Sequence, residues 1–372
     1  MDFTQSNFTG PDSTAHNDNA VFPLLADPSS YVACPWDLGR DAKRRAYWIG
    51  VFRKHLVSLL EHVISEAAER GADASTQRDD VDRRFTAYLD TVERDPGAFG
   101  RLDVLSICWH RENALRAANV ADPYRVLKRD ENERALALLP AVLEELDRAD
   151  GAERDRMVIE GVFAGNIFDM GAEHTQKMFE QGQVDFASVR DKLKPRPWRY
   201  DALETWSARL SDKPYQAAVL FVDNAGPDVV LGMIPLARDL IRRGTTVVLS
   251  ANTEPALNDV THDELVGLID CVARFDPMTR NALESKRLRL VESGNWAPLI
   301  DLTRVSPQLA AVCEELPIDL VVLEGMGRSM ESNPDCELTC DCLRLAMVKD
   351  LGVAESFDAE LFDLVMRYEQ VD

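Results

Sequence analysis

The spacing of hydrophobic residues changes near residue 200 of the chain. Before that point apolar side chains recur at helical spacing, most clearly over Asp41–Arg70, where nine of them share one broad face and Gly71 follows as a C-cap. Shorter helical patterns cover Arg83–Glu93, Arg111–Ala118 and Asn132–Leu146. No convincing strand pattern occurs before about residue 185. The sequence therefore predicts a mostly helical N-terminal half.

Strand and helix patterns alternate after residue 200. Short apolar runs typical of strands cover residues 217–222, 245–249, 287–291 and 320–323. Two of the helices between them have clear start signals, because Thr261 and Glu264 form a capping box and Ser306 precedes a proline. Residues 340–348 are predicted to be helical. This alternation predicts an α/β fold with a doubly wound, mainly parallel sheet and a mostly helical N-terminal subdomain.

The chain divides into three predicted parts. Residues 1–20 are polar and predict a mobile tail, residues 21–193 form the helical subdomain, and residues 194–372 form the α/β domain. The second boundary falls at Lys194–Tyr200, where two prolines and neighbouring aromatic residues indicate a connector or a lid.

Composition narrows the classes of partner. The chain has 372 residues, with 42 basic and 64 acidic side chains and a net charge of −22, so nucleic acid and anionic membrane surfaces are not expected as partners. There is no apolar run of membrane-spanning length and no visible secretory signal. Seven cysteines, an odd number, fit reduced thiols in the cytoplasm better than a disulfide framework. The six histidines form no paired metal motif.

Candidate functional residues are expected directly after the predicted strands, because ligands of open parallel sheets bind beyond the carboxyl ends of the strands. Each of the four strand ends carries small, amide, carboxylate or hydroxyl side chains. The four segments are Asp223–Gly226, Ser250–Asn252, Glu292–Asn295 and Glu324–Arg328. If the strands are neighbours, these groups converge on one crevice.

Asp223 and Asn224, with Asp259 in the loop after the second strand, offer hard oxygen ligands that suit a divalent ion. The alternative is structural: Asp223 and Asn224 would form an Asx turn, and Asp259 would be an acid at a helix entry. Both interpretations stay open at this point.

The segment Glu324-Gly325-Met326-Gly327-Arg328 could present backbone N–H groups and a guanidinium to an anion. An ordinary glycine turn with a surface arginine is the alternative. Lys349 could hold a phosphate, or it could satisfy the dipole of the helix predicted before it. Cys336, Cys340 and Cys342 match no closed zinc pattern and are interpreted as structural thiols.

Several long segments resemble the metal-dependent damage-control phosphatases, in the branch marked by an EGMGR motif. They are FVDNAGPDVVLGMIPLARDLIRRGTTVVLSANTEPALNDVT, DLVVLEGMGRSMESN, CDCLRLAMVKD, GVFAGNIFDMGA, PRPW and RENALRAANVADPYRVLKRDENERALALLP. The resemblance covers nearly the whole chain after about residue 20. This branch includes stand-alone plant proteins and the C-terminal domain of a pantothenate-kinase-like protein.

The resemblance implies a metal-dependent phosphomonoester hydrolase of small metabolites. The expected substrate is 4′-phosphopantetheine or its oxidised or damaged forms, with sugar phosphates as weaker substrates. By motif match the metal ligands are Asp223, Asn224 and Asp259, and Glu324–Arg328 is the signature loop. Asn166 and Lys349 resemble pocket residues, and Asn252 is a candidate substrate-binding residue at the second strand end.

Two residues depart from the pattern of this branch. Ala225 stands where the family usually has a serine, and Arg344 stands where a lysine is usual. Neither departure touches the proposed metal ligands, so they bear on substrate preference and rate.

The expected mechanism uses Mg²⁺, Mn²⁺, Co²⁺ or Ni²⁺ to polarise the phosphoryl group, with Lys349 and Arg328 stabilising its charge. The nucleophile is either a metal-held water, which we favour, or Asp223. We expect the helical half to close over the crevice, with Lys194–Tyr200 and the Asn166 segment lining a slot for an extended substrate arm. The rival interpretations are a sugar-phosphate phosphatase, a non-catalytic phosphometabolite-binding module and a methyltransferase. A methyltransferase is disfavoured because it predicts a glycine-rich loop after the first strand, and that loop contains only one glycine, Gly226.

Overall fold

A computed structural model describes residues 19–168, 186, 190 and 192–371 of the chain. The predicted tail, residues 1–20, therefore lies almost entirely outside the described residues. The first half of the described chain is helical, as predicted, and contains α1 (Ala42–Glu69), α2 (Ser75–Arg94), α3 (Val104–Ala117), α4 (Arg125–Arg148) and α5 (Gly151–Phe168). Asp41 caps α1 by accepting a hydrogen bond from the Arg44 N–H, and Asp103 and Ser106 form a capping box at α3.

The second half of the chain forms a seven-stranded sheet with the strand order β1-β7-β6-β5-β2-β3-β4. Its strands are β1 (Tyr200–Asp201), β2 (Ala217–Phe221), β3 (Thr246–Ala251), β4 (Leu288–Glu292), β5 (Ile318–Glu324), β6 (Asp341–Met347) and β7 (Leu364–Glu369). Neighbouring strands are parallel except for β6 and β7, which are antiparallel. The predicted mainly parallel α/β sheet is confirmed. The division of the chain at residue 193 stays a prediction.

The helix predicted at residues 340–348 is wrong, because this segment is strand β6. All seven residues of β6 are buried, so the strand faces protein on both sides and shows none of the alternation that marks a half-exposed strand. Strands β1 and β7 were not predicted either. The four strands that were predicted match β2 to β5 within two residues at each end.

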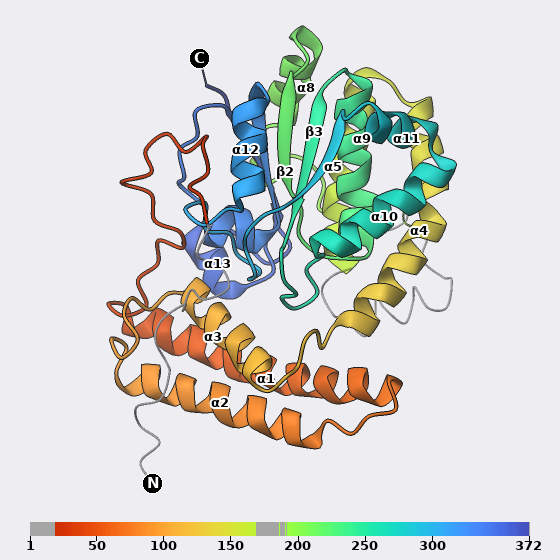
Figure 1. Cartoon of the computed structure of the whole chain (residues 1–372). Coiled ribbons are helices and arrows are strands. Elements are labelled where there is room, and N and C mark those ends of the chain that lie inside the picture. The colour runs from red at the N-terminus through yellow and green to blue at the C-terminus, as the bar shows by residue number, and fades with distance from the viewer. Residues whose placement is uncertain (1–18, 169–185, 187–189, 191, 372) are drawn as a thin grey trace.

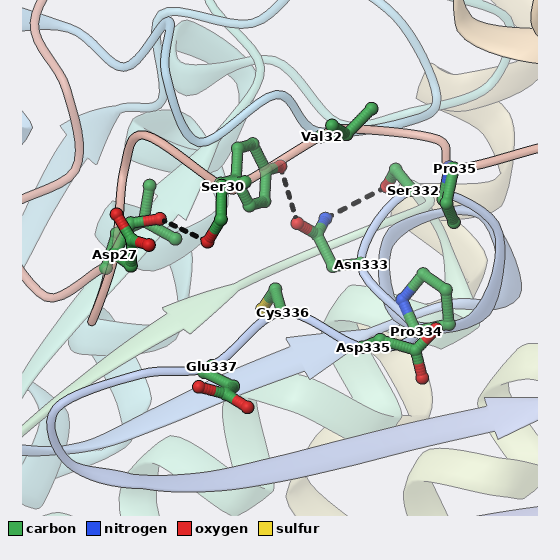
Figure 2. Close-up of a pocket in the computed structure, with 12 residues that line it drawn as sticks. Asp27, Ser30, Val32, Pro35, Ser332, Asn333, Pro334, Asp335, Cys336 and Glu337 are labelled. Atoms are coloured by element: carbon green, nitrogen blue, oxygen red, sulfur yellow. Dashed lines mark hydrogen bonds between the residues drawn. The ribbon is translucent and has the colours of Figure 1, made fainter.

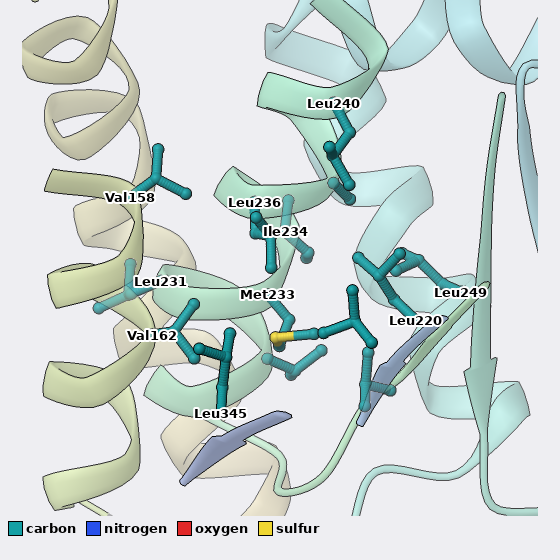
Figure 3. Packing of buried hydrophobic residues seen from close by; sticks show 14 of the residues in the cluster. Val158, Val162, Leu220, Leu231, Met233, Ile234, Leu236, Leu240, Leu249 and Leu345 are labelled. Carbon is teal, nitrogen blue, oxygen red and sulfur yellow. The ribbon is translucent and has the colours of Figure 1, made fainter. Parts of the chain in front are cut away.

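Both faces of the sheet are covered, and alternate residues of β2 point into different cores. Leu220 packs with α4, α5 and α9 (Ile234–Arg242), whereas Phe221 packs with Phe22 and α12 (Pro307–Glu315) on the other face. Figure 3 shows the first of these cores, with Val158 and Val162 of α5 beside Leu231 and Met233. The remaining elements are α8 (Leu203–Asp212), α10 (His262–Phe275), α11 (Pro277–Glu284), α13 (Leu351–Ser356) and the π-helical turns η1 (Asp228–Met233) and η2 (Gly327–Glu331).

Helices α1, α2 and α3 form a separate layer at one end of the sheet (Figure 1). They share a hydrophobic core with Leu299, Met330 and Val348, which follow strands β4, β5 and β6. The layer therefore covers the carboxyl ends of the strands. A hydrogen bond links this layer to the segment after β6, because the Tyr47 hydroxyl of α1 donates to Asp350 Oδ2 at 2.8 Å. Along the described part of the chain, no helix combines the length and the apolar composition that a membrane crossing requires.

Candidate active site

The polar strand ends converge as the sequence predicts. Asp223 and Asn224 follow β2, and the loop after β3 folds back over them, so that Asn224 and Asp259 form an isolated β-bridge. The Val260 N–H donates to the Asp223 carbonyl at 3.0 Å, which fixes the loop against the strand end. Asp223, Asn224 and Asp259 are all at least 93% buried, with exposed fractions of 7%, 5% and 1%. The three predicted metal ligands thus lie together.

Arg328 bridges two of these three residues through ion pairs. Its guanidinium is fully buried and forms ion pairs with Asp223 Oδ1 and, at 2.9 Å, with Asp259 Oδ2. It also donates to Asn252 Oδ1 at 3.2 Å, and Asn252 Nδ2 donates to Asp259 Oδ2 at 2.9 Å. The alternative of a surface arginine is therefore wrong. Arg328 and Asn252 hold the two carboxylates in place.

Gly325 and Gly327 leave room for this arrangement. Gly325 has a φ of +94°, and a Cβ atom there would lie 1.8 Å from Asp223 Oδ2. A Cβ atom at Gly327 would lie 2.6 Å from the Pro298 carbonyl oxygen. The Gly325 N–H donates to the Leu345 carbonyl at 3.0 Å within the sheet. The contribution of Gly325 to the site is therefore space for the Asp223 carboxylate.

A second group of acids lies behind Asp223. Ligand atoms of Asp223, Asp228 and Glu324 are all within 4.8 Å of one another, and all three residues are buried. Asn166 of α5 reaches this group, because its Nδ2 donates to Asp228 Oδ2 at 3.0 Å and to Glu324 Oε1 at 2.9 Å. The Asp223 N–H donates to Glu324 Oε2 at 3.1 Å. Asp228 is a site residue that the sequence reasoning missed, although it follows Asp223 and Asn224 in the same DNAGPD segment.

The donor set fits a divalent cation. The site contains four buried carboxylates, those of Asp223, Asp228, Asp259 and Glu324, and the buried guanidinium of Arg328 forms ion pairs with two of them, Asp223 and Asp259. Buried carboxylates are costly without compensating charge, and carboxylate and amide oxygens are the ligands that hard divalent ions prefer. Of the site carboxylates and amides described above, Asp223, Asn224 and Asp259 line the adjoining cavity, whereas Asp228, Glu324, Asn166 and Asn252 are not part of its lining.

This cavity has a volume of about 370 Å³. Asp223, Asn224 and Asp259, together called the floor below, line it along with Met326, Gly327 and Lys349. Its wall comes from the helical layer. The wall residues are Trp48, Val51, Phe52 and His55 of α1 and Val104, Cys108 and Arg111 of α3. Asn166, Asn252, Glu324, Gly325 and Arg328 lie behind the lining and support the floor.

The expectation that Lys194–Tyr200 lines this slot is wrong, since none of its residues contributes to the cavity. Lys194 instead pairs with Asp363 at 2.5 Å, and the Trp198 ring packs on Phe163 with the centroids 4.9 Å apart. Lys349 follows strand β6, not a helix, so the helix-dipole alternative for this lysine is also wrong.

A second hollow is lined by residues 332–337, which follow η2, and by residues between Leu25 and Pro35 (Figure 2). It has a volume of about 360 Å³, and Asp27, Asp335 and Glu337 contribute three acidic groups to its lining. Asn333, which accepts a hydrogen bond from the Tyr31 hydroxyl at 2.7 Å, lies at its centre. None of the described residues that line it carries a basic side chain, so we do not assign a phosphate site to this hollow.

Comparison with known proteins gives consistent matches. Residues 51–365 match the family described as the damage-control phosphatase ARMT1-like domain. The chain is 35% identical to the damage-control phosphatase At2g17340 of Arabidopsis thaliana, over 94% of this chain and 97% of that protein. It is 33% identical to the 4′-phosphopantetheine phosphatase of Mus musculus, over 93% of this chain and 48% of that protein.

Two further matches extend the comparison. The chain is 40% identical to pantothenate kinase 2 of Arabidopsis thaliana, over 94% of this chain and 42% of that protein. It therefore spans less than half the length of the kinase and of the mouse phosphatase. A crystal structure of a DUF89 family protein from Pyrococcus horikoshii has the same fold, with a TM-score of 0.62 at 14% identity, covering 86% of this chain and 96% of that one.

Proposed function

Because the chain belongs to the ARMT1-like damage-control phosphatase family, we propose that it hydrolyses phosphate monoesters of small metabolites. The proposed substrate is 4′-phosphopantetheine or one of its oxidised or damaged forms. The observation that carries the proposal is the floor of buried carboxylate and amide oxygens from Asp223, Asn224 and Asp259, which lies at the base of a cavity of about 370 Å³.

We propose Asp223, Asn224 and Asp259 as the ligands of a divalent ion, Mg²⁺, Mn²⁺, Co²⁺ or Ni²⁺, since these three line the cavity. The bound ion would supply charge that polarises the phosphoryl oxygens. Arg328 orients the carboxylates of Asp223 and Asp259. Behind them, the Glu324 carboxylate fixes the backbone by accepting the Asp223 N–H, and Asn166 in turn donates to Glu324. The proposed nucleophile is a water molecule, because the Asp223 carboxylate is already engaged by the Arg328 guanidinium.

Lys349 is the proposed contact for the phosphate oxygens. It lies beside the floor of the cavity and brings a positive charge to a protein whose net charge is −22. Such a charge would offset the repulsion that a phosphate dianion meets on approach. The same net charge supports the expectation that the protein has no nucleic-acid partner.

The cavity wall supports an extended substrate. Trp48, Val51 and Phe52 of α1 provide an apolar surface that a pantetheine arm could contact and that a hexose phosphate would leave uncovered. The name of the mouse relative points to the same substrate. All seven cysteines are free thiols, which supports the proposed cytoplasmic location.

A phosphate-release screen tests the proposal. The panel comprises 4′-phosphopantetheine, its sulfonate and disulfide forms, hexose phosphates and nucleotides, each with Mg²⁺, Mn²⁺, Co²⁺ or Ni²⁺ and with excess chelator. The highest kcat/KM is expected for a phosphopantetheine form in the presence of metal. Better turnover of a hexose phosphate would favour the sugar-phosphate alternative, and binding without phosphate release would favour a binding module.

A further inference from the structure

Glu331 is a buried acid of the cavity that the proposed metal site does not use. It is the last residue of η2, the turn that also carries Arg328, and its exposed fraction is 5%. It lines the same cavity as Asp223, Asn224 and Asp259. Among the described residues, no hydrogen bond or ion pair to its carboxyl group is found. A buried acid without a protein partner calls for an explanation, such as a bound water, an ion or a catalytic role.

The surroundings of Glu331 favour its protonated form. Burial, together with the negative charge of Asp350, raises the pKa of Glu331 to about 8. Arg328, the cation on the same turn, forms its ion pairs with Asp223 and Asp259 and not with Glu331. The titratable and charged groups around Glu331, counting both its close neighbours and the other lining of the cavity, are Cys34, His55, Cys108, Arg111, Asp223, Asp259, Lys349 and Asp350.

Neither His55 nor Cys108 is a better proton donor at neutral pH. Burial lowers the pKa of His55, and the charge of Arg111 lowers it further, so the imidazole is neutral. Burial raises the pKa of the Cys108 thiol to about 12. Asp350 accepts hydrogen bonds from the Tyr47 hydroxyl and from backbone N–H groups of α13.

We propose that Glu331 is the general acid that protonates the departing oxygen of the substrate, an inference that rests on the proposed phosphatase activity. A water oxygen forms a bond to phosphorus, and the bond between phosphorus and the ester oxygen breaks. The electron pair of that bond stays on the ester oxygen, which takes the proton of Glu331 and leaves as an alcohol. The proton that the attacking water loses returns through solvent to the Glu331 carboxylate, so the products are the alcohol and inorganic phosphate.

The test compares leaving groups. An alkyl alkoxide needs a proton to leave, whereas p-nitrophenolate does not, so Glu331→Gln should lower kcat for 4′-phosphopantetheine by about 100-fold and leave kcat for p-nitrophenyl phosphate within roughly threefold. Glu314→Gln, a change of an exposed glutamate on α12, is the matched control and should alter neither rate. An equal loss on both esters, or no loss on either, overturns the assignment.

The pH profile gives a second readout that a structural role would not change. For the wild-type protein, kcat with the alkyl ester should fall above about pH 8 as Glu331 loses its proton, and this fall should be absent in Glu331→Gln. A profile unchanged by the substitution overturns the proposal. A wild-type protein that releases phosphate from no ester would instead contradict the proposed function, which separates the two failures.

Discussion

Gly325 lies so close to Asp223 that a Cβ atom on residue 325 would be 1.8 Å from the Asp223 Oδ2 atom. Gly325→Ala should therefore displace the carboxylate and abolish phosphate release. Gly244→Ala is the matched control, because Gly244 has a similar φ of +101° but open space around the new Cβ. Backbone strain should cost each variant about 1–2 kcal/mol of stability, and the overlap with Asp223 should add to that loss in Gly325→Ala; urea unfolding measures both. Equal activity in the two variants would show that the contact with Asp223 is unimportant.

Arg328→Met should leave Asp223 and Asp259 without their buried cation. Removing one partner of a buried ion pair costs about 3–5 kcal/mol, which urea unfolding in chelator would measure. Added divalent ion should raise the melting temperature of this variant more than that of the wild type, because the ion replaces the missing charge. Arg289→Met, which removes a partly exposed pair with Glu315, is the control and should cost at most about 1 kcal/mol. Equal metal-induced shifts would contradict the interpretation.

Asp259→Asn should remove metal-dependent stabilisation together with activity. An ion bound only by the folded protein adds about 2.7 kcal/mol at a hundredfold excess over its Kd, which corresponds to a melting shift of a few degrees. Thermal scans with and without metal check this, and Asp263→Asn, at an exposed carboxylate nearby, should keep the full shift. A variant that retains both the shift and phosphate release would remove Asp259 from the ligand set.

Val51→Asn should reveal the role of the apolar wall in substrate choice. Val51 lines the cavity from α1, whereas Val57 of the same helix is 62% exposed and provides the matched control as Val57→Asn. Loss of an apolar contact with the substrate arm should lower kcat/KM for 4′-phosphopantetheine by about tenfold or more. Turnover of a short phosphate ester that cannot reach the wall should not change. A parallel loss for both esters would place the substrate arm elsewhere.

Much of the architecture was predictable because local signals agree with the tertiary structure. Thr261 and Glu264 form the predicted capping box at α10, and Ser306 caps α12 through the Leu309 N–H. Strands β2 to β5 are apolar runs with polar ends, which is also why the meeting of Asp223, Asn224 and Asp259 could be predicted. Their roles as ligands stay a prediction.

The errors have physical causes that a single sequence does not display. Strand β6 is buried on both faces and even encloses the guanidinium of Arg344, which donates to the Cys336 carbonyl at 2.7 Å, so its pattern resembles that of a buried helix. Spacing along the chain cannot tell which acid lines a cavity and which lies behind it, so Asp228 and Glu331 were missed. The wall of the cavity was assigned to the wrong segment because α1 reaches it through contacts distant in sequence.

The hydrogen bond from Tyr47 to Asp350 spans 303 residues of sequence. On the ribosome, α1, α2 and α3 emerge long before strand β6 and helix α13 exist, and during that time the apolar face that will cover the sheet has no partner. The entropy cost of closing a loop rises only slowly with the length of the loop. Contacts between residues distant in sequence, such as Tyr47 and Asp350, nevertheless form slowly. We therefore expect the cavity to be completed late in folding, and the apolar face of the nascent helical layer to be a surface that chaperones protect.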